Sequence, residues 1–180
     1  QKVIVSSDKD FFQILDNDTI LHRPIQKETL NRNSIIEKYG IHPNNFALAR
    51  AMAGDASDNL PGVGGTGLPT VKKRFPFLVE ERFYTIDEIL EHCEELDSKL
   101  KVHQNILNKA ELIENNYKIM QLYSPFISPQ GKRKIKYNID NAEYLFNKTE
   151  IMKMMMEDGF GQVNFESLFQ MCKRVSLENN

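Results

Sequence analysis

Gln1-Lys2-Val3-Ile4-Val5-Ser6-Ser7-Asp8-Lys9-Asp10 is the stretch that decides the fold class. Its β-branched apolar run, bounded by small polar residues, predicts a strand buried on both faces of a parallel sheet. A short helical stripe from Phe11 to Leu15 follows, and Thr19-Ile20-Leu21 then resembles a second strand. This strand–helix–strand order predicts an α/β fold.

The opening strand also bears on domain organisation. A strand inside a parallel sheet needs a neighbour on each side, and no later segment has the same buried-strand character. We therefore expect an N-terminal half upstream, in cis or as a separate chain, so that these 180 residues are a fragment or half of a split protein.

The hydrophobic period becomes helical from residue 33 onward. We expect residues 1–32 to be the C-terminal portion of an α/β core and residues 33–180 to form a mostly helical domain. The expected helices cover Ile35 to Tyr39, Phe46 to Ala53, a segment from Ile86, Ile106 to Met120, Glu150 to Glu157 and Phe165 to Arg174. Ser34 is the expected N-cap of the first, and Asn44 or Asn45 of the second.

The composition excludes several classes of protein. With 41% hydrophobic and 27% charged residues, the chain is not disordered throughout, and its apolar runs are too short to cross a bilayer. Two cysteines make neither a disulfide framework nor a cysteine zinc site. A net charge of −2 argues against a wholly basic coat for nucleic acid. We expect a cytoplasmic protein with no membrane partner.

Two acidic pairs are candidates for metal chemistry. Asp8 and Asp10 follow the first strand and, in an extended segment, would point the same way at the carboxyl edge of the sheet. Asp55 and Asp58, in Gly54-Asp55-Ala56-Ser57-Asp58-Asn59, are three apart and would share one face of a helical turn. Each pair has an ordinary alternative, as a helix cap or turn.

A glycine-rich turn follows the second pair. Leu60-Pro61-Gly62-Val63-Gly64-Gly65-Thr66-Gly67 leads into Thr70-Val71-Lys72-Lys73-Arg74, which looks like a helix start carrying bases. Glycines let backbone amides approach a phosphate, and the lysines can neutralise neighbouring phosphates. The alternative is a surface loop with a solvated basic face.

Taken in order, these motifs closely resemble the flap endonuclease or 5′-3′ exonuclease family, over about residues 1–75. That family includes the 5′ nuclease domain of bacterial DNA polymerase I and the ribonuclease H of T-even-like phages. The resemblance implies the C-terminal part of a PIN-like nuclease core, followed by a helix–hairpin–helix-like (helix-three-turn-helix) DNA-binding motif. It implies cleavage of phosphodiester bonds in flap, nicked or branched DNA, or in RNA–DNA hybrids, within a bacterial cell or a phage-infected host.

The resemblance also assigns residues. Asp8, Asp10, Asp55 and Asp58 match metal ligands of a catalytic two-ion site for Mg²⁺ or Mn²⁺. The hairpin and its bases match DNA-binding positions, here Gly62, Gly64, Gly65, Thr66, Gly67, Thr70, Lys72 and Lys73. In several members the hairpin also holds K⁺. The family's remaining metal carboxylates precede the first strand, so we expect this chain alone to be inactive.

Other classes of function remain open at this stage. One such opening is a departure from the family pattern: where the family often has a lysine directly after the hairpin, this sequence has Leu68-Pro69, and Lys72 and Lys73 follow a turn later. A non-catalytic DNA-binding module would explain Gly62 to Lys73 but would leave both acidic pairs without a role. A structural or adaptor protein would explain neither feature.

Overall fold

The computed structural model describes residues 1–95, 100–123, 127–141, 147–160 and 163–178. Its contacts divide the chain into two units, residues 1–126 and 127–180. The domain boundary predicted at residues 32 and 33 lies inside the first unit. Within the described ranges, no helix combines the length and the apolar character that a membrane span requires.

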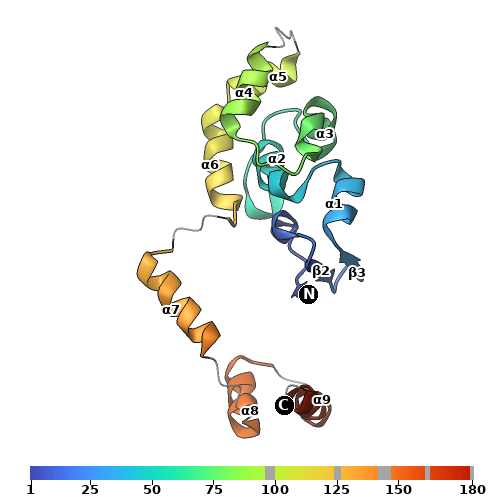
Figure 1. Ribbon diagram of the computed structural model, residues 1–180, viewed down its shortest axis with the longest axis vertical. Helices are drawn as coiled ribbons and strands as arrows, with labels where there is room; N and C mark the ends of the chain where they lie inside the picture. The colour runs from blue at the N-terminus through green and yellow to red at the C-terminus, as the bar shows by residue number, and fades with distance from the viewer. Residues whose placement is uncertain (96–99, 124–126, 142–146, 161–162, 179–180) are drawn as a thin grey trace. The chain divides into compact units, whose positions relative to one another are not determined.

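A small sheet opens the first unit (Figure 1). Its order is β1 (Lys2–Val5), β2 (Thr19–Arg23) and β3 (Glu28–Leu30). Strands β1 and β2 are parallel, and the crossover between them contains the 3₁₀ helix η1 (Asp10–Ile14). The predicted strand–helix–strand order is therefore confirmed. Strand β3 pairs antiparallel with β2 and was not predicted, because three residues are too few to carry a periodic signal.

Strand β1 is more exposed than predicted. It is hydrogen-bonded to β2 on one side, and Val3 and Val5 are 57% and 67% exposed. The expectation of a strand buried on both faces is wrong for this chain, because no described segment pairs with the second edge or covers the face that carries the two valines.

Helices form the rest of the first unit. Helix α2 (Phe46–Ala53) is buried along almost its whole length, lies beside α6 and α3 (Figure 1), and agrees with its predicted bounds. The predicted helix from 106 to 120 is instead two helices, which are interrupted at Asn108 and Lys109. The remaining elements are α1 (Arg32–Tyr39), η2 (Pro43–Asn45), η3 (Ala56–Asp58), α3 (Leu68–Arg74), η4 (Pro76–Val79), α4 (Ile86–Glu95), α5 (Lys101–Leu107) and α6 (Ala110–Met120).

Two predicted helix caps are corrected. The carboxamide oxygen of Asn31 accepts a hydrogen bond from the backbone of Ser34, so Asn31 and not Ser34 is the N-cap of α1. Asn45 precedes α2 but its side chain makes no cap. That side chain instead donates to the carbonyl oxygens of Leu78 and Glu80, and so fastens the start of α2 to the η4 region.

An aromatic cluster joins the sheet region to the helices. The Phe12 ring lies 5.2 Å from that of Phe46 and 5.8 Å from that of Tyr39, and Phe12 and Phe46 are almost fully buried. Such edge and tilted contacts add to the free energy of burying the rings. Since Phe12 lies in η1, this cluster fixes the segment after β1 against the start of α2.

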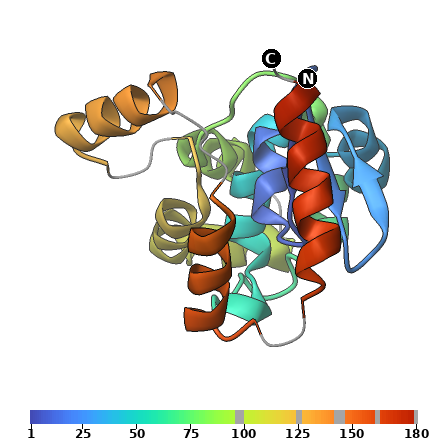
Figure 2. The same ribbon diagram turned by 90° about the horizontal axis from the view of Figure 1, so that it is seen from below.

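The second unit contains α7 (Pro129–Asp140), α8 (Lys148–Glu157) and α9 (Phe165–Glu178), the orange and red helices of Figure 2. Of its described side chains, only Phe169 is buried, beneath the ammonium group of Lys148. The first unit therefore holds nearly all of the described core.

Candidate functional site

The chain turns sharply after β1. The Asp8 carboxylate accepts a hydrogen bond of 2.8 Å from the backbone N–H of Asp10, and Asp10 begins η1. The segment that carries Asp8 and Asp10 is therefore not extended as expected, because this side-chain-to-backbone bond closes a turn. Asp8 is exposed, whereas the Asp10 side chain is only 21% exposed.

The second acidic pair lies on a single 3₁₀ turn, η3, in agreement with the predicted helical turn. Asp55 is its N-cap: the carboxylate accepts bonds of 2.9 Å from the Ser57 N–H and 2.6 Å from the Ser57 hydroxyl. Asp58 ends the turn and is exposed. Asp55 also exchanges two backbone hydrogen bonds with Leu60, which closes the loop around η3.

Arg50 brings the two acidic pairs together, and the sequence reasoning missed it. Its side chain is 6% exposed; Nη1 contacts an Asp10 carboxylate oxygen and Nη2 contacts an Asp55 carboxylate oxygen. One acid from each motif is thus bound to the same guanidinium. The sequence feature that could have indicated Arg50 is that it is the one charged residue in the otherwise apolar helix α2. We call Asp8, Asp10, Arg50, Asp55 and Asp58 the acidic junction.

The electrostatics of the acidic junction favour a bound cation. Burial raises the pKa of Asp10, the Arg50 guanidinium opposes this rise, and the nearby charges of Asp8 and Asp58 add to it. The carboxylates of both motifs therefore lie within electrostatic reach of one another. Four acids with one arginine leave an excess of negative charge, which a further cation would reduce.

The donor atoms of the acidic junction fit a hard divalent cation, because Mg²⁺ prefers carboxylate oxygens and retains several waters. The arrangement itself is not closed around an ion. Within the described ranges, no three His, Cys, Asp or Glu side chains lie close enough together to hold a metal. Arg50 lies between Asp10 and Asp55, and Asp8 and Asp58 are at the exposed side.

Residues 60–67, which we call the hairpin segment, dock on the C-terminal end of α2. The Val63 N–H donates to the Met52 carbonyl oxygen at 2.8 Å. A Cβ on Gly62 would lie 2.0 Å from the Ala53 carbonyl oxygen, and one on Gly54, whose φ is +78°, would lie 2.2 Å from the Gly62 nitrogen. Both positions therefore require glycine, because two backbones are in direct contact.

The other predicted hairpin residues divide between surface and core. Gly64, Gly65 and Gly67 are exposed, as a contact with a phosphate backbone would require. Thr66 is 1% exposed; its hydroxyl is 3.0 Å from the Met52 carbonyl oxygen and its N–H donates to Val63. The prediction that Thr66 contacts DNA is thus corrected, because both of its donors are used inside the protein.

Helix α3 presents the predicted bases. Leu68 and Pro69 form its first turn, and the N–H of Thr70, which is half-buried, donates to the Gly67 carbonyl oxygen. Lys72 and Lys73 are exposed and form no ion pair with an acid among the described residues. The aliphatic stem of Lys72 lies against Gly40 at the end of α1.

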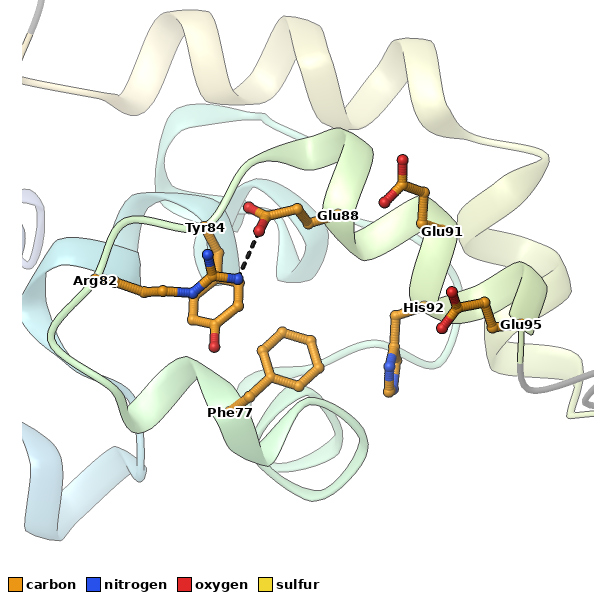
Figure 3. A pocket seen from close by; sticks show the side chains of 7 residues that line it. All are labelled: Phe77, Arg82, Tyr84, Glu88, Glu91, His92 and Glu95. Carbon is orange, nitrogen blue, oxygen red and sulfur yellow. Dashed lines mark hydrogen bonds and ion pairs between the residues drawn. The ribbon is translucent and has the colours of Figure 1, made fainter.

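A pocket of about 290 Å³ lies elsewhere, between η4 and α4 (Figure 3). The Arg82 guanidinium stacks 3.8 Å from the Tyr84 ring centroid and pairs with Glu88 at 2.5 Å. Phe77 lies between the rings of Tyr84 and His92 (Figure 3), at 4.8 and 4.9 Å. The pocket shares no residue with the acidic junction or the hairpin segment.

Comparison with curated proteins finds relatives of consistent description. A 5′-3′ exonuclease of Buchnera aphidicola subsp. Schizaphis graminum is 35% identical over 159 residues, which are 86% of this chain and 50% of the relative. A 5′-3′ exonuclease of Aquifex aeolicus is 24% identical over 92% of this chain and 56% of its own. DNA polymerase I of Thermus thermophilus is 25% identical over 87% of this chain and 18% of its own. The chain thus spans about half the length of the two exonucleases.

Comparison with solved structures supports the fold. A mutant of the T5 5′-exonuclease matches with a TM-score of 0.54 and 20% identity, over 66% of this chain and 46% of that one. The T5 5′-exonuclease with bound zinc matches with a TM-score of 0.53 over 42% of its length. A T5 flap endonuclease complex with DNA and metal ions matches with a TM-score of 0.52, also over 42%. No protein-family model matches the sequence.

Proposed function

Because this chain is a homologue of the 5′-3′ exonucleases and of the 5′ nuclease domain of DNA polymerase I, we propose that it is the C-terminal half of a metal-dependent, structure-specific 5′ nuclease. Residues 1–32 complete an α/β nuclease core, and the helical remainder binds DNA. The observation that supports this most strongly is the convergence of both acidic motifs on Arg50.

In this proposal the four aspartates hold divalent metal, Mg²⁺ or Mn²⁺. Bound metal in a two-ion site activates water and stabilises the leaving oxygen. The structure neighbours that carry divalent ions support such a requirement. Of the residues present, Asp10 and Asp55 are best placed as direct ligands, since they already share one cation. Asp8 and Asp58 are exposed beside them and would act directly or through water.

The proposed nucleic-acid surface combines the exposed glycines with the bases of α3. Gly64, Gly65, Gly67, Lys72 and Lys73 are all exposed. Such a surface would bind phosphates without sequence-specific contacts to the bases. We propose that helices α2 and α3 with the hairpin segment form the helix–hairpin–helix-like motif. The substrate would be flap, nicked or branched DNA or an RNA–DNA hybrid, as in primer removal, with K⁺ at the hairpin.

The proposed partner in catalysis is an N-terminal half, in cis or as a separate chain. The second edge of β1 has no strand on it among the described residues, and Val3 and Val5 are exposed. An added parallel strand would pair that edge and cover those side chains. It would also supply further carboxylates, so the 180 residues alone would not cut DNA.

The alternative is a non-catalytic DNA-binding module. Such a module has no use for an aspartate pair joined to a second pair through a buried arginine, and negative charge beside a DNA-binding surface weakens binding. The comparisons do not favour this alternative, because the curated relatives are exonucleases and polymerases.

A cleavage assay on flap DNA with Mg²⁺ tests the proposal, using the 180-residue chain with and without the N-terminal half. We expect cutting only with both halves, and its loss when EDTA or Asp55→Asn is introduced. Robust cutting by the chain alone would refute the half-enzyme part. DNA binding without any cutting by the two halves together would favour the binding module.

A further inference from the structure

Arg50 occupies the position where the two acidic motifs meet. It is the single charged side chain of α2, whose other side chains are Phe, Leu, Met and Ala. Its two terminal nitrogens bind different carboxylates, Asp10 on one and Asp55 on the other. The guanidinium therefore bridges the motifs, as a single ion between them would.

Because the Arg50 side chain is buried, its positive charge needs the two carboxylates when no metal is bound. The Arg50 side chain is 6% exposed, and those of Asp10 and Asp55 are 21% and 16% exposed. The buried charge of Arg50 is tolerated only with opposite charge beside it, and the two partly buried acids would repel each other if the arginine were absent. Arg50 thus offsets one of the two negative charges and separates the two carboxylates.

A divalent ion would bind the same two carboxylates. A ligand oxygen must lie about 2.1 Å from Mg²⁺, whereas the guanidinium now contacts one oxygen of Asp10 and one of Asp55. The ion and the guanidinium are both cations, so they would also repel each other across a short distance. Arg50 therefore opposes the binding of an ion by Asp10 and Asp55 together.

We propose that Arg50 is a built-in counter-cation that holds Asp10 and Asp55 together before metal arrives and competes with metal for them. This inference rests on the proposed function, since it takes these acids as metal ligands. Arg50 is accordingly a positioning residue. Its removal should strengthen metal binding and weaken the metal-free fold, two opposite effects that an ordinary structural arginine would not produce.

The experiment measures Mn²⁺ binding by isothermal titration calorimetry on the full 180-residue chain, together with thermal melts in EDTA and in Mn²⁺. The variants are Arg50→Gln and Arg50→Met, which remove the charge, and Arg50→Lys, which keeps it. Arg32→Gln is the charge-matched control, because Arg32 pairs with Glu81 and contacts no predicted ligand.

We expect Arg50→Gln and Arg50→Met to bind Mn²⁺ at least about tenfold more tightly, because each substitution removes a positive charge beside the ion. Both should melt at a lower temperature than the wild type in EDTA and gain more from Mn²⁺. Arg50→Lys should fall between them and the wild type, and Arg32→Gln should bind Mn²⁺ as the wild type does.

Equal or weaker Mn²⁺ binding by folded Arg50→Gln and Arg50→Met would overturn the inference, and so would a tenfold gain in Arg32→Gln. If one charge-removing variant does not fold in EDTA, the other and Arg50→Lys give the comparison. Failure of the proposed function has a different signature: no flap cleavage with the N-terminal half present, whatever the Mn²⁺ affinity. Tighter Mn²⁺ binding by the variants would still support the inference in that case.

Discussion

The acidic junction and the hairpin segment are neighbours in the chain, but different forces hold them. Ion pairs between Arg50 and the carboxylates of Asp10 and Asp55 join the junction. Direct backbone contact holds the hairpin segment, where Gly62 meets the end of α2 and Val63 bonds to Met52. Asp55 links the two regions, since its carboxylate binds Arg50 and its backbone pairs with Leu60, the first residue of the hairpin segment.

This difference separates what each region can do. A site held by charge responds to metal ions, to pH and to any substitution that alters charge. A segment held by close backbone packing keeps its shape, so its exposed glycines stay in place. Substitutions should therefore be able to change the turnover of the complete enzyme and its DNA affinity separately.

The largest effect should come from the acidic junction in the complete enzyme. Asp55→Ala or Asp58→Ala should lower turnover at least about a thousandfold, because a metal ligand is lost. DNA affinity should stay nearly intact or rise slightly, since negative charge beside the phosphates is removed. Single-turnover flap cleavage and equilibrium DNA binding measure the two quantities. Unaltered turnover in either variant would contradict the metal assignment.

The second effect should come from the backbone contact. Gly62→Ala should reduce the free energy of unfolding by about 3 kcal/mol, because its Cβ would overlap the Ala53 carbonyl group, which is part of the backbone. Gly64→Ala is the matched control: its Cβ would lie no closer than 3.7 Å to another residue, at the Asn105 amide nitrogen, so we expect a change within about 0.5 kcal/mol. Urea unfolding measures both. Equal losses in the two variants would show that the close approach at Gly62 has no energetic consequence.

The third prediction concerns DNA affinity alone. Replacing Lys72 and Lys73 together by alanine should weaken DNA binding about tenfold and flatten its salt dependence by up to about two units of slope. Turnover of bound substrate and stability should change little, because both ammonium groups are exposed. Titrations at several salt concentrations and on different sequences measure this. A loss confined to some sequences would indicate base reading and contradict backbone binding.

The sequence predicted those features that have local causes. The parallel pair of strands follows from β-branched runs, and the turn at Asp55 and Asp58 from their spacing. It could not give Arg50 its role, because that depends on the fold bringing Asp10 of η1, which is distant in sequence, beside the one charge of α2 and the nearby Asp55. Thr66 was misassigned for a similar reason: nothing in the local pattern says that its hydroxyl points into the core.

Thr66→Val, the fourth prediction, tests that correction. The substitution keeps the shape but removes a hydroxyl that bonds inside the protein, so stability should fall by about 1 kcal/mol. DNA affinity should not change, whereas a direct phosphate contact would require it to fall. Thr70→Val is the control on the α3 surface. Weakened DNA binding in folded Thr66→Val would return Thr66 to the DNA-binding surface.

The smallest effect concerns His42, which lies before α2 and outside both regions. Burial lowers the pKa of its imidazole, because the buried ring favours its neutral form. Its Nδ1 accepts a hydrogen bond from the Asn44 N–H, which protonation of Nδ1 would break, and its Nε2 has no hydrogen-bond partner among the described residues. The unfolded chain takes up this proton near pH 6.5 and the folded protein only at lower pH, so stability is fully present above pH 6.5 and declines as pH falls below it. His42→Asn removes the titration and keeps a short acceptor for the Asn44 N–H. Urea unfolding from pH 7.5 to 5.5 should give a flatter curve for the variant, whereas parallel curves would mean that His42 does not couple the fold to pH.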